Sequence, residues 1–121
     1  MGTITVTTDP ARRLVRARME GMLGLADVQR FGREEQAAAA GMGVASGAFD
    51  LLIETHGNMV QTQAVMEAFG ALIVHSPLKA RRIATVRDGV LTRMQTRRMS
   101  RMRSGAEVFE CLADAEAWLA S

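Results

Sequence analysis

Apolar and polar residues alternate in two short segments near the start of the chain. Isoleucine and valine alternate with threonines over residues 3–8, and valine, alanine and methionine alternate with arginines over residues 13–19. Successive side chains of a strand point to opposite faces of a sheet, so each segment predicts a strand with one buried face. Asp9 and Pro10 lie between the two segments and are typical turn residues. We therefore predict an antiparallel hairpin.

After the hairpin, helical and strand patterns take turns along the chain. Helices are predicted over residues 26–42, from Ala64 to just before Pro77, over 90–103 and over 114–120, and strands over 48–55, 82–87 and 107–112. Residues 48–55 are apolar on both alternations, which predicts a central strand covered on both faces. Strands that alternate with helices indicate β-α-β units and a parallel part of the sheet. The predicted fold class is α/β or mixed α+β, as a single domain over residues 1–121.

Two of the predicted helices mix apolar and charged positions. Glu35 interrupts the apolar face of the helix over residues 26–42. In the helix over residues 90–103, one side is expected to be partly apolar. The residues that line this side are Leu91, Met94 and Met102.

The composition is that of a globular protein. Of the 121 residues, 48% are hydrophobic and 23% are charged, which argues against disorder. The single cysteine excludes an internal disulfide framework and fits a reducing compartment. The apolar stretch around residues 64–74 is too short and too interrupted to span a bilayer, and the first ten residues lack the order of a secretory signal. We therefore expect a cytoplasmic protein that is not transmembrane.

Positive charge is concentrated in one segment. Residues 79–103 hold nine basic residues and one acidic residue, a local charge of +8, whereas the whole chain carries +2. Arg93, Arg97 and Arg101 are spaced by four and so line one side of the predicted helix. This side is a candidate site for an anionic ligand or surface, or for an acidic protein. The alternative is a solvated face whose arginines bury their stems on the sheet and pair with acidic residues elsewhere.

Several function classes lack their usual residues in this sequence. Tyrosine is absent, and four phenylalanines and one tryptophan are few for stacking bases, so specific nucleic-acid binding is not expected. Two histidines and one cysteine, without a spaced ligand pair, predict no metal site. No glycine-rich phosphate loop and no nucleophile motif occurs, which predicts that the protein needs no cofactor and is not an enzyme.

The end of the predicted central strand is the best place for a ligand site. Open α/β sheets bind ligands beyond the carboxyl ends of their strands, and His56 and Asn58 follow this strand directly. The imidazole of His56 can exchange a proton near neutral pH. The alternatives are a structural or exposed histidine and, for Asn58, a turn or helix-cap residue. Further along, Cys111 alternates with Phe109 and is expected to pack as a small apolar residue.

Three segments together resemble a known family. LVRARMEGMLGLADVQRF (residues 14–31) has the strand, glycine and helix pattern that opens STAS-like domains, RRIATVRDG (81–89) is similar to their penultimate strand, and EVFECLADAEAWLAS (107–121) resembles their closing strand and helix. The chain thus resembles the small bacterial SpoIIAA-like proteins, which are related to the anti-sigma-factor antagonists. The resemblance implies a mixed sheet of about five strands with helices packed on it, and a binding module instead of an enzyme.

The resemblance also implies a possible switch. The better-known antagonists bind a kinase-like anti-sigma partner and are phosphorylated on a serine or threonine at a helix N-terminus. The corresponding segment here, residues 54–65, contains no serine, and Thr62 is the nearest hydroxyl in the helix. Thr62 is therefore either a phosphorylation site or the residue that begins the helix.

Two functions remain open at this point. The first is a non-enzymatic interaction or regulatory module with an unidentified protein partner, or with a second copy of the chain through its methionine-rich helix faces or its N-terminal strand edge. The second is a small-molecule or lipid-binding protein, since the related lipid-transfer domains share a similar sheet. In that case the pocket would lie at the carboxyl ends of the central strands, near His56.

Overall fold

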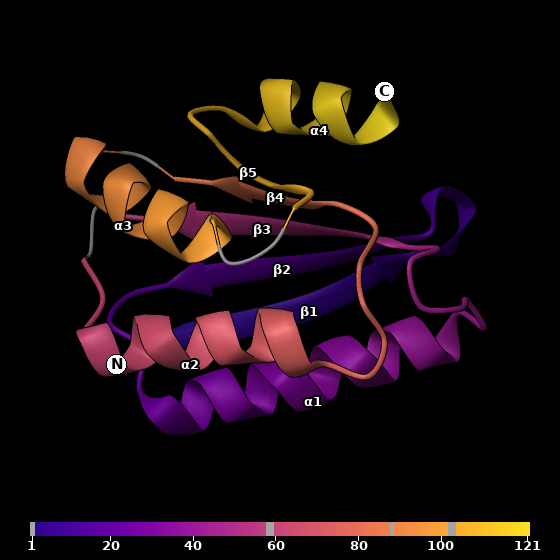
Figure 1. Ribbon diagram of the computed structural model, residues 1–121, viewed down its shortest axis with the longest axis horizontal. Coiled ribbons are helices and arrows are strands. Elements are labelled where there is room, and N and C mark those ends of the chain that lie inside the picture. The colour runs from indigo at the N-terminus through magenta and orange to yellow at the C-terminus, as the bar shows by residue number, and fades with distance from the viewer. Residues whose placement is uncertain (1, 58–59, 88, 102–103) are drawn as a thin grey trace.

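Five strands form one mixed sheet and lie side by side in the order in which the chain reaches them (Figure 1). The structure is a computed structural model that describes residues 2–57, 60–87, 89–101 and 104–121. Its strands are β1 (Thr3–Asp9), β2 (Leu14–Glu20), β3 (Asp50–His56), β4 (Ile83–Val86) and β5 (Ala106–Phe109). β1 and β2 are antiparallel, and the other neighbours are parallel. The predicted hairpin, the central strand and the mixed α/β class are confirmed.

Helices connect the parallel strands and cover both faces of the sheet. They are α1 (Leu25–Gly41), α2 (Gln63–His75), α3 (Val90–Ser100) and α4 (Leu112–Ala120). α1 and α2 lie along one face, α3 lies beside α2 and against β5, and α4 lies on the opposite face (Figure 1). Among the helices of the described residues, none is long and apolar enough to cross a membrane.

The core has two parts because the sheet buries side chains on both faces. On the side of α1 and α2 the buried residues include Val15, Ala17, Val28, Phe31 and Ile53. On the side of α4 they are Leu14, Leu52, Ala84, Ala115 and Leu119. β3 contributes to both parts, which explains why its sequence is apolar on both alternations.

Glu35 is buried inside the face that it was expected to interrupt. Its residue is only 6% exposed, and its carboxylate accepts a hydrogen bond of 2.6 Å from Nε2 of Gln36. Burial removes water from the carboxylate and thereby raises the pKa of Glu35 above its usual value. Gln36 also exchanges hydrogen bonds with the backbone of Leu78, which ties α1 to the segment that leads into β4.

An ion pair closes the sheet edge at which β3 and β4 begin. Arg81 donates two hydrogen bonds to the nearly buried carboxylate of Asp50, from Nε at 3.0 Å and from Nη2 at 2.9 Å, and a third to the carbonyl of Leu119. The paired carboxylate raises the pKa of Arg81. These bonds tie the end of α4 to the sheet, so this edge is occupied by structural contacts.

The predicted apolar side of α3 is not confirmed. Met94, which was expected on that side, is 48% exposed. The side chains of Leu91 and Met102 lie outside the described residues. The helix ends at Ser100, earlier than predicted. Among the described side chains of α3, Gln95 and Thr96 form hydrogen bonds that are described with the site below.

The prediction that Cys111 packs beside Phe109 is wrong. β5 ends at Phe109 and α4 begins at Leu112, two residues earlier than predicted. Cys111 therefore lies at the start of a helix, where the alternation of a strand no longer applies, and it is exposed.

Candidate functional site

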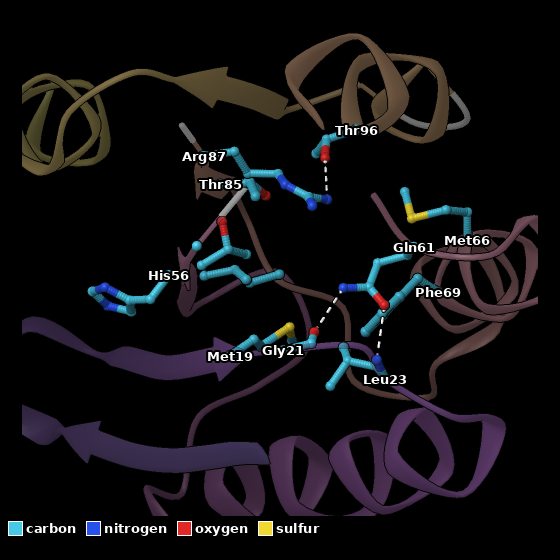
Figure 2. A pocket seen from close by; sticks show the side chains of 13 residues that line it. Met19, Gly21, Leu23, His56, Gln61, Met66, Phe69, Thr85, Arg87 and Thr96 are labelled. Carbon is cyan, nitrogen blue, oxygen red and sulfur yellow. Dashed lines mark hydrogen bonds between the residues drawn. The ribbon is translucent and has the colours of Figure 1, made fainter. Parts of the chain in front are cut away.

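A hollow lies where β2, β3 and β4 end, beside Met66 and Phe69 of α2 and Thr96 of α3 (Figure 2). The hollow is open to solvent, and the space in it that is available to the centre of a water-sized sphere is about 40 Å³. The pairing of the parallel strands brings their ends together, with Met19 of β2 opposite Thr55 of β3 and Glu54 of β3 opposite Val86 of β4. The apolar walls of the hollow are formed by Met19, Leu23, Ile53, Met66 and Phe69.

Two glycines let the chain leave the strands without filling the hollow. Gly21 follows β2 with a φ of 76°, and Gly57 follows β3 with a φ of 87°. Both values lie in the left-handed region, which residues with a Cβ atom rarely adopt. Both glycines line the hollow, so the two turns shape its walls.

Arg87 places a cationic side chain in the wall of the hollow. It follows β4, and by alternation it lies on the same face as Ile83 and Thr85, the face on which α1 and α2 pack. Its residue is 6% exposed, and its Nη1 donates a hydrogen bond of 2.8 Å to Oγ1 of Thr96 in α3. Burial lowers the pKa of Arg87, because the charged guanidinium loses hydration. The guanidinium of Arg87 is thus placed in the wall of the hollow by its position after β4 and by its hydrogen bond to Thr96 of α3.

Gln61 joins the loops around the hollow. Its Oε1 accepts a hydrogen bond of 2.9 Å from the backbone N of Leu23, and its Nε2 donates one of 3.0 Å to the carbonyl of Gly21 (Figure 2). Its backbone also exchanges two hydrogen bonds with the side chain of Gln95 in α3. Gln61 therefore links the loop before α2 to the end of β2 through its side chain and to helix α3 through its backbone.

The structure places the predicted site residues at and after the end of β3 in different surroundings. His56 is the last residue of β3 and lines the hollow, but its imidazole points away from the other side chains drawn there (Figure 2). Its residue is exposed, which fits the alternative reading of an exposed histidine. Asn58 lies outside the described residues. Thr62 caps α2, because its Oγ1 accepts a hydrogen bond of 3.2 Å from the backbone N of Val65.

The three arginines that were predicted to form one basic side of α3 have different surroundings. Arg93 forms an ion pair of 3.0 Å with Glu110, and its side chain is 19% exposed. Arg97 and Arg101 are exposed and line a separate, open depression between α3 and β5. For Arg93 the structure thus shows the alternative, an arginine paired with an acidic residue elsewhere. None of the three lines the hollow at the strand ends.

Sequence reasoning found the location of the hollow and missed the residues that give it polarity. Arg87 and Gln61 were not among the predicted site residues. The available signal for Arg87 was its place as the last residue of the predicted strand RIATVR (82–87), because ligands gather beyond carboxyl strand ends. For Gln61 the sequence carries no such signal, since its partners lie 34 to 40 residues away.

The hollow is apolar and cationic in its chemistry. Among the described residues that line it, the charged or titratable side chains are Arg87 and His56, and neither a carboxylate nor a cysteine occurs there. In the part of the chain that the structure describes, no three histidine, cysteine or acidic side chains gather as metal ligands would. Hydrogen-bonding groups are supplied by Thr55, Gln61, Thr85 and Thr96.

Comparison with known proteins identifies the fold. No family model matches the sequence, and no curated protein matches it. A solved structure is similar, that of an uncharacterized protein from the DUF3478 family with a SpoIIAA-like fold from Shewanella loihica PV-4. The TM-score is 0.69 at 20% sequence identity, and the match covers 98% of this chain and 93% of that one. The predicted fold is thereby confirmed: this chain has a SpoIIAA-like fold.

Proposed function

We propose that this protein is a non-enzymatic binding protein and that the hollow at the ends of β2, β3 and β4 holds a small, mainly apolar molecule. The observation that carries the proposal is the composition of the walls, where Met19, Leu23, Ile53, Met66 and Phe69 surround a few polar groups. Ligand pockets typically combine apolar walls with a small number of placed polar side chains. The position fits as well, because open α/β sheets bind ligands at this edge.

The residues around the hollow favour binding over catalysis. General acid–base chemistry needs a titratable group within hydrogen-bond reach of the reacting atoms and a partner that orients it. The imidazole of His56 points away from the other side chains drawn around the hollow (Figure 2). The guanidinium of Arg87 is held by the hydroxyl of Thr96 and stays charged in its ordinary role as a hydrogen-bond donor. This arrangement can recognise a ligand and supports no proton transfer.

The test uses octanol as a neutral, apolar probe in isothermal titration calorimetry. We expect saturable binding to the wild type and its loss in Met66→Trp, because the indole fills the hollow from α2. The matched control is Met94→Trp, which changes an exposed methionine outside the hollow and should bind octanol as the wild type does. Absence of saturable binding to the wild type, or equal binding by Met66→Trp, would contradict the proposal.

A second candidate function, docking of a protein partner, is favoured by exposed apolar side chains at the same end of the sheet. Met22, Leu25, Val60 and Met94 are between 41% and 51% exposed. Met22, Val60 and Met94 each directly precede a residue of the hydrogen-bonded group around the hollow, namely Leu23, Gln61 and Gln95. A cluster of exposed apolar side chains often marks an interaction surface.

Native mass spectrometry of protein purified from its own host tests this second function. We expect a defined companion, either another protein or a second copy of the chain, that is lost in the double variant Met22→Ser/Val60→Ser. Ala120→Ser at the far end of the chain is the control and should keep the companion. A wild-type protein that is a bare monomer, or a companion that survives the double variant, would contradict it.

A further inference from the structure

The outer edge of β5 offers backbone hydrogen-bonding groups beside two exposed arginines. We propose that this edge binds an extended, acidic segment of a partner protein, which adds to the sheet as a further strand next to β5. In this arrangement, acidic side chains at every second position of the segment pair with Arg97 and Arg101 of α3. The surface is separate from the hollow described above, because neither arginine lines that hollow.

The backbone of β5 is paired on one side. β5 ends the sheet, so β4 is its only neighbour among the described strands. The carbonyls of Gly105 and Phe109 accept hydrogen bonds from the backbone of β4 and of the residue after it, at 2.8 and 3.0 Å. Successive residues of a strand direct their backbone groups to opposite edges, so Ala106 and Val108 direct theirs outward. No hydrogen bond within the described residues uses these outward groups, and such groups can pair with another chain.

An open depression runs along this edge, between β5 and α3, which lie against each other (Figure 1). It is lined by residues 104–108 and by Arg97 and Arg101. Alternate side chains of a strand point to opposite faces, so consecutive residues line one depression where it follows the edge of the strand. The space in it that is available to the centre of a water-sized sphere is about 320 Å³, compared with about 40 Å³ in the hollow. The depression therefore has room for an extended peptide beside the strand.

The charge beside the edge favours an acidic segment. Arg97 and Arg101 are exposed, and neither forms an ion pair with another described residue. Like charges four positions apart on a helix repel each other. Glu107 also lines the depression, but its register partner is Ala84, so its side chain lies on the face that α4 covers. Acidic side chains of a partner would supply the counter-charge on the face of α3.

The spacing of the two arginines matches that of a strand. The backbone N of Arg101 donates a hydrogen bond of 3.1 Å to the carbonyl of Arg97, so the two residues are one helical turn apart. Four residues of an α-helix rise by about 6 Å. Side chains at every second position of a strand share a face and are about 6.6 Å apart. Two acidic residues with one residue between them therefore fit the two arginines, and the residue between them points to the face of Glu107.

The probe is the blocked peptide acetyl-TETETETE-amide, titrated into the full chain by isothermal titration calorimetry. We expect saturable binding of one peptide per chain. The matched peptide acetyl-EETTEETT-amide has the same composition and charge, but no two of its glutamates are two positions apart. It can pair only one glutamate with the two arginines on one face, so it should bind about threefold more weakly or worse.

A double variant tests the arginines. Arg97→Gln/Arg101→Gln should weaken binding of the alternating peptide by about tenfold and should make the two peptides bind alike. The matched control is Arg33→Gln/Arg98→Gln, which removes the same charge from two exposed arginines outside the depression. This control should bind both peptides as the wild type does. Circular dichroism checks that both double variants are folded.

Methylation of the peptide backbone tests the strand pairing itself. Alternate N–H groups of an added strand point toward β5 and away from it. We therefore compare one alternating peptide that is N-methylated at every threonine with another that is N-methylated at every glutamate. One of them should lose binding and the other should keep it. If both bind as the unmethylated peptide does, no strand is added and the inference is wrong.

The remaining outcomes also decide the question. The inference is wrong if acetyl-EETTEETT-amide binds as tightly as the alternating peptide, or if the control variant loses as much affinity as Arg97→Gln/Arg101→Gln. Absence of saturable binding would show that the arginines only protect the edge from pairing with other chains, and would overturn the inference. None of these results depends on octanol in the hollow, so this inference and the proposed function can fail separately.

Discussion

Gln61, which lines the hollow, exchanges two hydrogen bonds with Gln95 of α3. The backbone N of Gln61 donates to Oε1 of Gln95 at 3.1 Å, and Nε2 of Gln95 donates to the carbonyl of Gln61 at 2.7 Å. One residue further along α3, Thr96 accepts the hydrogen bond from Arg87. Two successive residues of α3 thus connect the helix to the loop before α2 and to the end of β4. The placement of α3 over the hollow therefore depends on polar contacts as well as on packing.

Removing the Gln95 side chain should loosen α3. In Gln95→Ala, two hydrogen bonds are lost and the free energy of unfolding should fall by about 1–2 kcal/mol. Hydrogen exchange followed by mass spectrometry should show faster exchange in α3, with little change in β2 and β3. The control is Gln63→Ala, because the Gln63 side chain donates a hydrogen bond to the nearby Glu67 on the exposed surface of α2. Equal exchange rates in the two variants would show that these bonds do not hold α3.

Removing the hydroxyl of Thr62 should destabilise α2. Its Oγ1 caps the helix by accepting a hydrogen bond from the backbone N of Val65, and the loss of such a cap costs about 1 kcal/mol. Thr62→Ala should therefore lower the free energy of unfolding by about that amount in chemical denaturation. Thr62→Ser keeps the capping oxygen and should stay close to the wild type. If the serine variant is as unstable as the alanine variant, the cap is not the cause.

Replacing the buried carboxyl of Glu35 should stabilise the protein at high pH. The pKa of Glu35 is raised in the folded protein by burial, so the folded state binds a proton more readily than the unfolded chain does. The stability contributed by this proton is fully present below the usual pKa of a glutamate and is lost as the pH rises through the raised value. Glu35→Gln removes this dependence because the amide stays neutral.

The measurement is the melting temperature of the wild type and of Glu35→Gln over a range of pH. The variant should melt higher by a few degrees at about pH 8 and close to the wild type at about pH 4. Glu34→Gln, an exposed neighbour on the same helix, is the control and should change the melting temperature little at either pH. A variant that melts lower than the wild type at high pH would contradict the effect of burial.

Two glycines of α1 should respond differently to the same substitution. Gly41 has open space around its Cβ position, so Gly41→Ala should raise the free energy of unfolding by about 0.5–1 kcal/mol through helix propensity. At Gly32 the added Cβ would lie 2.8 Å from Cδ2 of Leu72 in α2. The rotation of Leu72 that this contact requires offsets the gain. In urea denaturation, the free energy of unfolding should be higher for Gly41→Ala than for Gly32→Ala. The reverse order would show that Leu72 of α2 moves away from the added Cβ at little cost.

Much of the fold could be predicted because it depends on local patterns. The alternation over residues 3–8 and 13–19 determines which faces of β1 and β2 are buried, since side chains of a strand point to opposite faces. Residues 48–55, which are apolar on both alternations, predict a central strand for the same reason. The prediction failed where an element ended. Cys111 lies between β5 and α4, and neither periodicity applies to a residue between two elements.

The candidate site, too, could be predicted from the sequence only in part. The general rule about strand ends led to the region of His56, and the hollow lies there. The charge pattern led to Arg93, Arg97 and Arg101, which lie outside the hollow. A count of charges along the chain cannot show which arginines line a cavity, as Arg87 does, and which lie elsewhere, as Arg93 does in its ion pair with Glu110.

The sequence by itself determined the order of the strands and helices, the faces that they bury and the edge of the sheet at which a site would form. These properties follow from hydrophobic periodicity and from the handedness of β-α-β connections, which act over short stretches of chain. The tertiary structure alone decided that Arg87 is buried, that Thr96 holds it and that Gln61 joins three segments. Such contacts bring together residues far apart in the chain, because packing, and not sequence distance, decides which polar groups meet.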